Sequence, residues 1–364
     1  MSVQVPKPGP FIFRDHLYSN NGSTVLVHDM ADLTAPPVSR LSLTDQAMRM
    51  LFRYANGSAY AWAVCRNIGA VCYDVTDPVN PKPLAAGTVR PTASWTMIGA
   101  AIDQDTGQMY VEESRGMGTM ERRIIRYRLT EPGVTPIFDG MTILGMSQSG
   151  RGGLFAFLGE VGGRRLVAVT YSGEYTAIID TTASPFVVSR SGIPCLQAMD
   201  SRGGHLYGHD GDPIFNARER ALGVRRMQMA AVASRWSTYA GLDGPSPTRI
   251  ATMEAPGFWY DQDPNLRVIV RDDRRFVLSG WTDGKLGEYV SVLEVNATTG
   301  AWKPVGLPLT MPLGIEPVLV EITGPSTALW WGFPPYNNGW RYFAVPMTGL
   351  PYAPAMVDAV ELHV

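Results

Sequence analysis

The densest cluster of polar side chains lies in the segment HLYGHDGDP, from His205 to Pro213. On a β-strand, His205 and His209 would project from the same face, because side chains alternate with a period of two. Together with Asp210 in the turn that follows, they form a ligand set that suits a divalent metal ion. The alternative is that both histidines are ordinary strand residues and that Asp212 caps a helix opened by Pro213. We favour the alternative, because five histidines in the whole chain leave few further ligands.

A second candidate is the segment Ile214–Trp236, in which arginines alternate with methionines and small apolar residues. Gly223 interrupts it, which favours a short helix followed by a strand over one long helix. Arginine and methionine are enriched where proteins meet. Two interpretations stay open: an element that docks on another protein, and a solvated insertion between strands. In the first, the contact residues are Arg218, Arg220, Arg225, Arg226 and Met227.

A third candidate is the aromatic and proline-rich stretch near the end of the sequence. Trp330 and Trp331 are predicted to pack in the core, since aromatic side chains dominate the packing of large cores. Tyr336 and Trp340 leave two possibilities open: they pack in the same way, or they form a rim that binds a sugar or a peptide.

The overall composition excludes several classes of protein. The chain has 364 residues, of which 45% are hydrophobic and 18% charged, and a formal net charge of −2. This balance indicates a globular core and argues against nucleic acid as the main partner, because no basic stripe would neutralise phosphates. The sequence shows no signal-peptide pattern and no apolar run of the ~20 residues needed to cross a bilayer. We therefore expect synthesis in the cytoplasm and no membrane insertion.

Motifs of common catalytic classes are also missing from the sequence. We find no P-loop, dinucleotide fingerprint, nucleophile elbow, zinc-protease helix or kinase motif set, and we expect no cofactor. The cysteines Cys65, Cys72 and Cys195 are too few for a disulfide framework. Cys65 and Cys72 could face each other across a hairpin that turns at Asn67–Gly69, but we predict that all three are reduced, buried side chains.

A repeat must position these residues: an apolar strand, a short turn rich in Asp, Thr, Pro and Gly, and a second strand. Its copies follow each other at roughly 45–53 residues, apart from one interval of about 115 that holds a degenerate copy at 237–254. Two further β-like runs precede each hairpin. Marker residues of the copies are Asp29, Asp74, Tyr127, Asp180, Val295 and Pro346.

About seven units of four short strands predict an all-β fold, a single β-propeller domain over residues 1–364. Residues 213–236 would then be an insertion within the fifth blade. The first unit shows only three strand-like runs, FIFRDHLY, VLVHDM and VSRLSL, whereas the chain finishes on an additional one at Ala359–Val364. We therefore predict that this last strand pairs into the first blade and covers an open sheet edge. The alternative is a frayed tail.

One hairpin, VCYDVTDPVNPKPLAAG, resembles the repeat of LVIVD-type bacterial β-propellers, whose hairpins carry the pattern D-V-[ST]-D-P-x-N-P flanked by Val, Leu and Gly. The resemblance covers a few hairpins, is weaker in the first and fourth units, and implies a propeller fold without a particular activity. The matching residues are Val71, Asp74, Val75, Thr76, Asp77, Pro78, Asn80, Pro81, Leu84 and Gly87, with Asp29, Asp32 and Pro36 in the first unit and Asp180, Thr181 and Pro185 in the fourth.

Without a catalytic motif, the sequence favours a non-enzymatic scaffold that binds other protein subunits in an oligomeric assembly. Divergent propellers of this kind resemble structural components of bacteriophage tails, such as nozzle and adaptor proteins, which implies a place in the virion. Two alternatives stay open. One is a metal-dependent hydrolase or lactonase-like propeller enzyme, and the other is a carbohydrate-binding propeller that uses Tyr336 and Trp340.

Overall fold

The computed structural model describes residues 11–116, 120–130, 133–147, 154–171, 175–183, 185–189, 192–194, 196–211, 234–257, 266–282, 287–315, 317–324, 326–332 and 341–362. Within these ranges the regular structure is almost entirely β-strand, with two short 3-10 helices, η1 (Ala85–Gly87) and η3 (Pro312–Gly314). None of the described helices is long and apolar enough to cross a membrane. The described residues fall into two compact units, one within Met1–Gly153 and Ala183–Val188, the other within Leu154–Thr182 and Ser189–Leu362.

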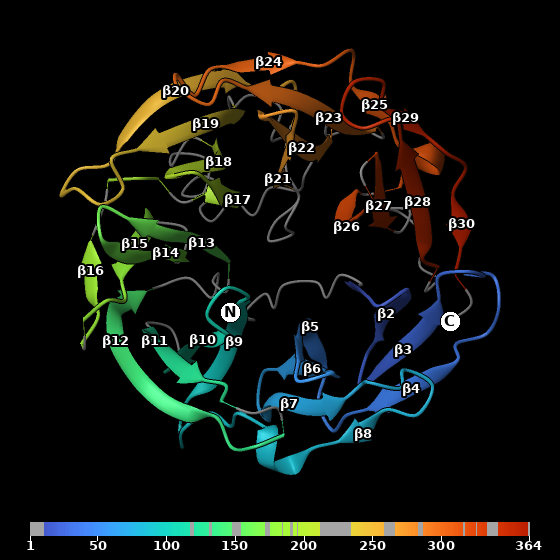
Figure 1. Cartoon of the computed structure of the whole chain (residues 1–364), viewed down its shortest axis with the longest axis vertical. Helices are drawn as coiled ribbons and strands as arrows, with labels where there is room; N and C mark the ends of the chain where they lie inside the picture. Colours follow the sequence, from blue (N-terminus) through green and yellow to red (C-terminus); the bar gives the residue numbers. More distant parts are fainter. Residues whose placement is uncertain are drawn as a thin grey trace. The chain divides into compact units, whose positions relative to one another are not determined.

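The first unit contains three antiparallel sheets in which the strands pair in chain order (Figure 1). The first sheet has β1 (Phe11–Phe13), β2 (His16–Asn21), β3 (Thr24–Asp29) and β4 (Ser39–Ser42). The second has β5 (Ala47–Ala55), β6 (Ser58–Cys65), β7 (Gly69–Asp74) and β8 (Lys82–Pro83). The third has β9 (Thr96–Asp103), β10 (Gln108–Arg115), β11 (Met120–Arg128) and β12 (Ile137–Ser147).

The remaining four sheets follow the same order. The fourth has β13 (Phe155–Val161), β14 (Arg164–Tyr171), β15 (Tyr175–Asp180) and β16 (Val187–Ser189), whose first two residues belong to the first unit. The fifth has β17 (Leu196–Arg202), β18 (His205–Gly211), β19 (Ser234–Ala240) and β20 (Thr248–Glu254). The sixth has β21 (Leu266–Arg271), β22 (Arg274–Thr282), β23 (Glu288–Val295), β24 (Trp302–Pro304) and β25 (Leu309–Thr310). The seventh has β26 (Val318–Gly324), β27 (Thr327–Gly332), β28 (Phe343–Thr348), β29 (Ala355–Met356) and β30 (Val360–Glu361).

Seven consecutive meanders of this kind, within the described ranges, are the blades of a β-propeller, so the predicted fold class is confirmed. The repeated hairpin of the sequence is the third and fourth strand of a blade, and Asp29, Asp74 and Asp180 end β3, β7 and β15. Each of these carboxylates accepts a hydrogen bond of 2.8–2.9 Å from the backbone N–H two residues later. This Asx turn is the physical reason for an aspartate at the recurring position.

Apolar clusters fill the space between neighbouring blades within each unit. Trp62, Trp236 and Trp330 are among the largest fully buried side chains. Trp62 also donates its indole N–H to the Gly87 carbonyl at 2.9 Å, which satisfies its polar atom inside the core. Trp330 and Trp331 are 0% and 4% exposed, which confirms that both belong to the core.

The predicted closure through the C-terminal strand is wrong for the described residues. β30 pairs with Phe343–Ala344 of β28, in the seventh sheet. The first sheet already has four strands, because FIFRDHLY is a hairpin of β1 and β2 that turns at Arg14 and Asp15. Both turn residues have positive φ, 50° and 59°, as a two-residue hairpin turn requires. The turn could not be recognised from the sequence, because glycine and asparagine, the usual residues of such turns, are absent there.

Cys65 and Cys72 do not face each other, contrary to what the hairpin spacing suggested. Cys65 pairs with Gly69 and Cys72 pairs with Trp62 across the β6–β7 ladder. The two side chains pack into different apolar clusters on opposite faces of the second sheet. Both cysteines are free and buried, as predicted, whereas Cys195 lies outside the described residues.

Candidate functional site

The predicted metal ligands are separated by the fold. His205 and His209 share one face of β18, but the strand continues to Gly211, so Asp210 projects from the opposite face. His205 Nδ1 accepts a hydrogen bond from Arg275 Nη1 at 2.9 Å, and burial, aided by Arg275, lowers the pKa of His205. Burial also holds the pKa of His209, which is 1% exposed, well below its ordinary value. Among the described residues, no three His, Cys, Asp or Glu side chains group together as a metal site would require.

The other predicted site residues lie outside the described part of the chain. These are the five contact residues Arg218, Arg220, Arg225, Arg226 and Met227, and the two rim residues Tyr336 and Trp340. Their roles stay predictions. The proposed insertion lies between β18 and β19 of the fifth sheet, but β19 begins at Ser234, so Arg235 and Trp236 belong to a strand rather than to the insertion.

Asp210 is instead the centre of a buried hydrogen-bond network in the fifth sheet. Its Oδ1 accepts from Arg235 Nε at 2.9 Å. Its Oδ2 accepts from Ser237 Oγ at 2.8 Å, Tyr239 OH at 2.7 Å and Arg249 Nη1 at 3.2 Å. The Asp210 side chain is 0% exposed, and all of these donors come from β19 and β20. A carboxylate with its oxygens occupied in this way stabilises the sheet.

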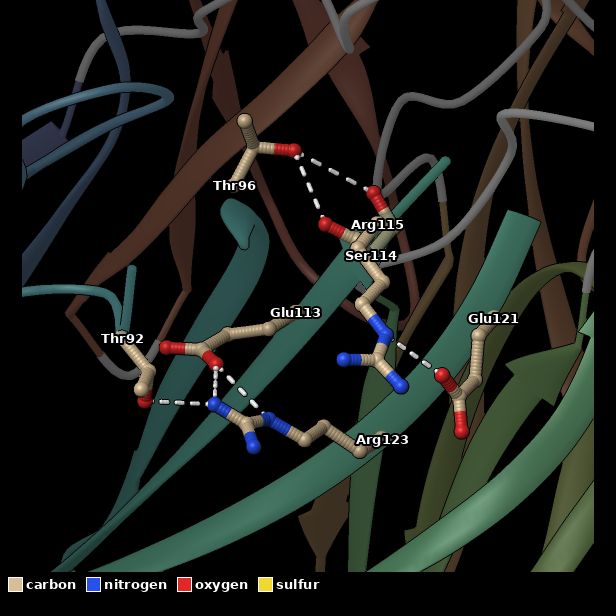
Figure 2. A network of polar contacts seen from close by, with 7 residues as sticks. All are labelled: Thr92, Thr96, Glu113, Ser114, Arg115, Glu121 and Arg123. Carbon is tan, nitrogen blue, oxygen red and sulfur yellow. Dashed lines mark hydrogen bonds and ion pairs between the residues drawn. The ribbon is translucent and has the colours of Figure 1, made fainter. Parts of the chain in front are cut away.

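A more open polar site lies at the end of the third sheet (Figure 2). There β10 ends, β11 begins, and the connection before β9 contributes Thr92 and Trp95. Thr96 ties the start of β9 to this end, because its hydroxyl donates to the Ser114 carbonyl at 3.2 Å. The residues drawn in Figure 2 are Thr92, Thr96, Glu113, Ser114, Arg115, Glu121 and Arg123.

The inner part of this site is the ion pair of Glu113 and Arg123, which lie directly opposite each other on β10 and β11. Arg123 donates to Glu113 Oε2 through Nε at 2.9 Å and Nη2 at 2.6 Å, and its Nη2 also donates to Thr92 Oγ1 at 2.6 Å. The side chains are 0% and 10% exposed. Burial raises the pKa of Glu113, and the guanidinium of Arg123 opposes that rise.

The outer part of the site is built on Trp95, whose ring contacts two guanidinium groups. The Cζ atom of Arg123 lies 3.9 Å from the ring centroid and that of Arg115 lies 4.7 Å from it. Such cation–π contacts contribute roughly 0.5–2 kcal/mol each. Arg115 also donates through Nε to Glu121 Oε2 at 2.6 Å, and its side chain is 50% exposed. The network therefore runs from the buried Glu113 to a guanidinium at the surface.

A tight turn places Trp95 in this position. The Trp95 N–H donates to the Thr92 carbonyl at 2.9 Å, which closes a four-residue turn. Ser94, the third residue of the turn, has a φ of 72°, where glycine is the usual residue. A non-glycine residue in this region costs about 1–3 kcal/mol, and the surrounding contacts of Trp95 offset that cost.

A second ion pair lies on the other face of the same strands. Glu112 pairs with Arg122, and both side chains are 0% exposed. Consecutive strand residues project from opposite faces, so the neighbours Glu112 and Glu113 each meet one arginine of β11. These ion pairs were not among the sites predicted from the sequence. The signal that could have found them is the pairing of two glutamates with two arginines across the segment VEESRGMGTMERR.

The arrangement has the chemistry of a contact surface. Nε of Arg115 binds Glu121, and its Nη groups lie at the half-exposed end of the side chain, where they can donate to a carboxylate of another molecule. By contrast, Glu113 and Asp210 are fully buried and bound by arginines, so neither is placed to exchange a proton with a substrate.

No protein-family model matches this chain, and no curated protein sequence matches it either. Among solved structures, the chain is similar to the β-propeller domain of Cps50 (Swd1) from Myceliophteria thermophila, with 12% identity and a TM-score of 0.47 over 100% of this chain and 98% of that one. Sqt1 of Saccharomyces cerevisiae shares 9% identity, with a TM-score of 0.44 over 95% and 93% of the two chains. An exo-β-1,3-galactanase from Phanerochaete chrysosporium shares 11% identity, with a TM-score of 0.37 over 86% of this chain and 88% of that one. These are likenesses of fold alone, and the LVIVD resemblance stays limited to a few hairpins.

Proposed function

We propose that this chain is a non-enzymatic β-propeller that binds other proteins as a subunit of a larger assembly. The observation that carries the proposal is Arg115, a half-exposed guanidinium that lies over Trp95 and is tied to Glu121. An arginine held in this way loses little conformational freedom when it meets a partner. Arginine and tryptophan are also the side chains that most often anchor protein interfaces. The partner group for Arg115 is a carboxylate.

The particular setting that we propose is the tail of a bacteriophage. It is supported by the analogy of a divergent, motif-poor propeller with nozzle and adaptor proteins of tails, an analogy of fold that carries no activity. In that setting the chain is made in the host cytoplasm and becomes part of the virion. The predicted contact residues Arg218, Arg220, Arg225, Arg226 and Met227 would supply a second contact surface between β18 and β19.

The experiment is native purification of the full-length tagged chain from its own cells, followed by measurement of the mass of the complex. The chain should sediment in a complex heavier than any homo-oligomer, and Arg115→Ser should weaken partner binding by roughly tenfold or more. The matched control is Arg274→Ser, because Arg274 is also half exposed, paired with a glutamate, Glu294, and stacked on an aromatic ring.

Two results would contradict the proposal. One is a chain that carries no other protein in the native extract. The other is an Arg115→Ser variant that binds its partner as tightly as the wild type does. The phage setting has a separate test: mass spectrometry of gradient-purified particles should detect the chain at constant stoichiometry, and its absence from the particles would reject that setting alone.

A further inference from the structure

β12 differs from the outer strands of the other sheets. It has 11 residues, whereas β4, β8, β16, β20, β24 and β29 have between 2 and 7. Within the described residues it pairs with β11 alone, so its other edge presents main-chain donors and acceptors away from the sheet. A long edge of this kind is a template for pairing with another strand.

This edge strand is also apolar where it meets solvent. Three of its apolar side chains are more than half exposed: Phe138 by 57%, Ile143 by 53% and Met146 by 60%. Their partners on β11 are, in the same order, Tyr127, Arg123 and Glu121. Those three partners alternate along β11, so the three apolar side chains share one face of the sheet. Burial of such side chains is favourable, at roughly 25 cal/mol per Å² of apolar surface.

Charge does not protect the edge. The sequence of β12, IFDGMTILGMS, contains one charged residue, Asp139. Its carboxylate pairs with Arg126 Nε and Arg128 Nη2, each at 3.1 Å. Charged side chains, above all lysine, are the usual device that keeps sheet edges apart. In β12 the single charge is already neutralised by its own sheet.

We propose that β12 pairs in antiparallel orientation with β12 of a second copy of this chain, about a twofold axis that passes through Thr142. This axis opposes residues at equal distances from Thr142, so that the exposed Phe138 and Ile143 meet apolar residues and the lone aspartate meets a glycine, whereas Ile137 at the end of the strand meets Ser147. Such a self-complementary contact is what a twofold interface requires. The opposed pairs are Phe138–Met146, Asp139–Gly145 and Met141–Ile143.

The irregularities of β12 obey the same symmetry. An extra residue interrupts the β11–β12 ladder between Phe138 and Met141, and another interrupts it at Leu144. Bulges bend a strand and increase its twist, which normally blunts an edge. Here the two bulges flank Thr142 at matching positions. Two copies related by the axis therefore bend alike, and their edges keep the same curvature where they meet.

This dimer goes beyond the proposed function and is independent of it, because it uses neither Arg115 nor Trp95. Its most direct test is a disulfide across the axis. In a Cys195→Ser background, Thr142→Cys places two thiols opposite each other, with Cα atoms about 4.5–5.5 Å apart, inside the range that a disulfide spans. Burial raises the pKa of Cys65 and Cys72 to about 12, so the native thiols stay unreactive.

Mild oxidation should convert most of the Thr142→Cys protein into a covalent dimer. The matched control is Val187→Cys in the same background, because Val187 lies on β16 and is 59% exposed. This control should stay monomeric. Equal cross-linking of both variants, or none at position 142, would overturn the proposal.

Sedimentation equilibrium of the otherwise unmodified chain provides a second test. Phe138→Lys should raise the dimer dissociation constant by at least about tenfold, since the twofold axis buries the new charge twice. Leu307→Lys, at a residue that is 84% exposed, should leave it unchanged. A wild-type chain that stays monomeric at high micromolar concentration, or a dimer that tolerates Phe138→Lys, would reject pairing through β12 even if the apolar strip binds another protein.

Discussion

The third and fifth sheets bury a carboxylate at the same position, near the end of the second strand and opposite an arginine of the third. The pairs are Glu113 with Arg123 and Asp210 with Arg235. In the fifth sheet, donors from two neighbouring strands fill both oxygens of Asp210. In the third sheet, Arg123 donates hydrogen bonds to Glu113 and Thr92, and its guanidinium also stacks on Trp95.

The same blade position can therefore hold either a network that ends within its own sheet or one that reaches the surface. Asp210 gathers donors toward itself, and the network ends within its own sheet. Arg123 keeps a hydrogen-bond donor and the face of its guanidinium for other groups, so its network continues through Trp95 to the half-exposed Arg115. The network that reaches the surface has the more buried arginine next to its carboxylate: the Arg123 side chain is 10% exposed, whereas that of Arg235 is 32% exposed.

The largest effect is expected for Arg123→Met. The substitution leaves Glu113 buried without its counter-charge, a change that costs about 3–5 kcal/mol of unfolding free energy. Urea unfolding at neutral pH measures this loss. The control Arg115→Met removes a half-exposed cation and should cost less than about 1 kcal/mol. If the two variants are equally stable, the buried pair is not what holds this end of the third sheet.

A smaller loss is expected for Asp210→Asn, at about 1–3 kcal/mol. The amide oxygen still accepts hydrogen bonds, although the amide NH2 group replaces the second acceptor. The two arginines that lose their counter-charge, Arg235 and Arg249, are 32% and 39% exposed and can turn toward water. The same urea experiment ranks the variants. A loss larger than that of Arg123→Met would contradict this ranking, because it would make the fifth sheet the more sensitive of the two.

The smallest effect is a pH dependence that belongs to the third sheet. Burial raises the pKa of Glu113 above its ordinary value of 4.5, so the folded state binds this proton more tightly than the unfolded state does. The unfolding free energy should therefore fall as the pH rises from 4.5 through the folded-state pKa. In Glu113→Gln this contribution disappears. The unfolding free energy of the wild type minus that of the variant should therefore decrease between pH 4.5 and the folded-state pKa of Glu113. A difference that increases with pH would mean that Arg123 outweighs burial.

Much of the fold could be predicted from the sequence because each blade repeats a local signal. Asp29, Asp74 and Asp180 mark the same Asx turn, and turn chemistry is readable from one stretch of chain. The β1–β2 hairpin was missed because Arg14 and Asp15 adopt positive φ without glycine. The closing strand was misplaced for the same reason, since the first blade seemed to lack one.

The candidate site was harder to predict because it depends on register. Glu113 meets Arg123 only if the β10–β11 ladder takes the one register that the structure shows, and Trp95 enters through the left-handed Ser94. The conformation of Ser94 leaves no local pattern in the sequence. One expected placement differs at the candidate metal ligands: the sequence placed Asp210 in a turn, whereas β18 extends through it, and the strand alternation turns this carboxylate away from His205 and His209.

The most direct measurement is site-specific photo-cross-linking in the cells that make the full chain. Ala93 is exposed and lies in the turn that positions Trp95, so a benzoylphenylalanine there samples the space beside Arg115. The control position is Ala31, an exposed alanine in the β3–β4 turn. Position 93 should form an adduct with a second protein, position 31 should not, and Arg115→Ser should abolish the adduct. No adduct at position 93, or one that survives Arg115→Ser, would contradict a protein-binding role for this end of the third sheet.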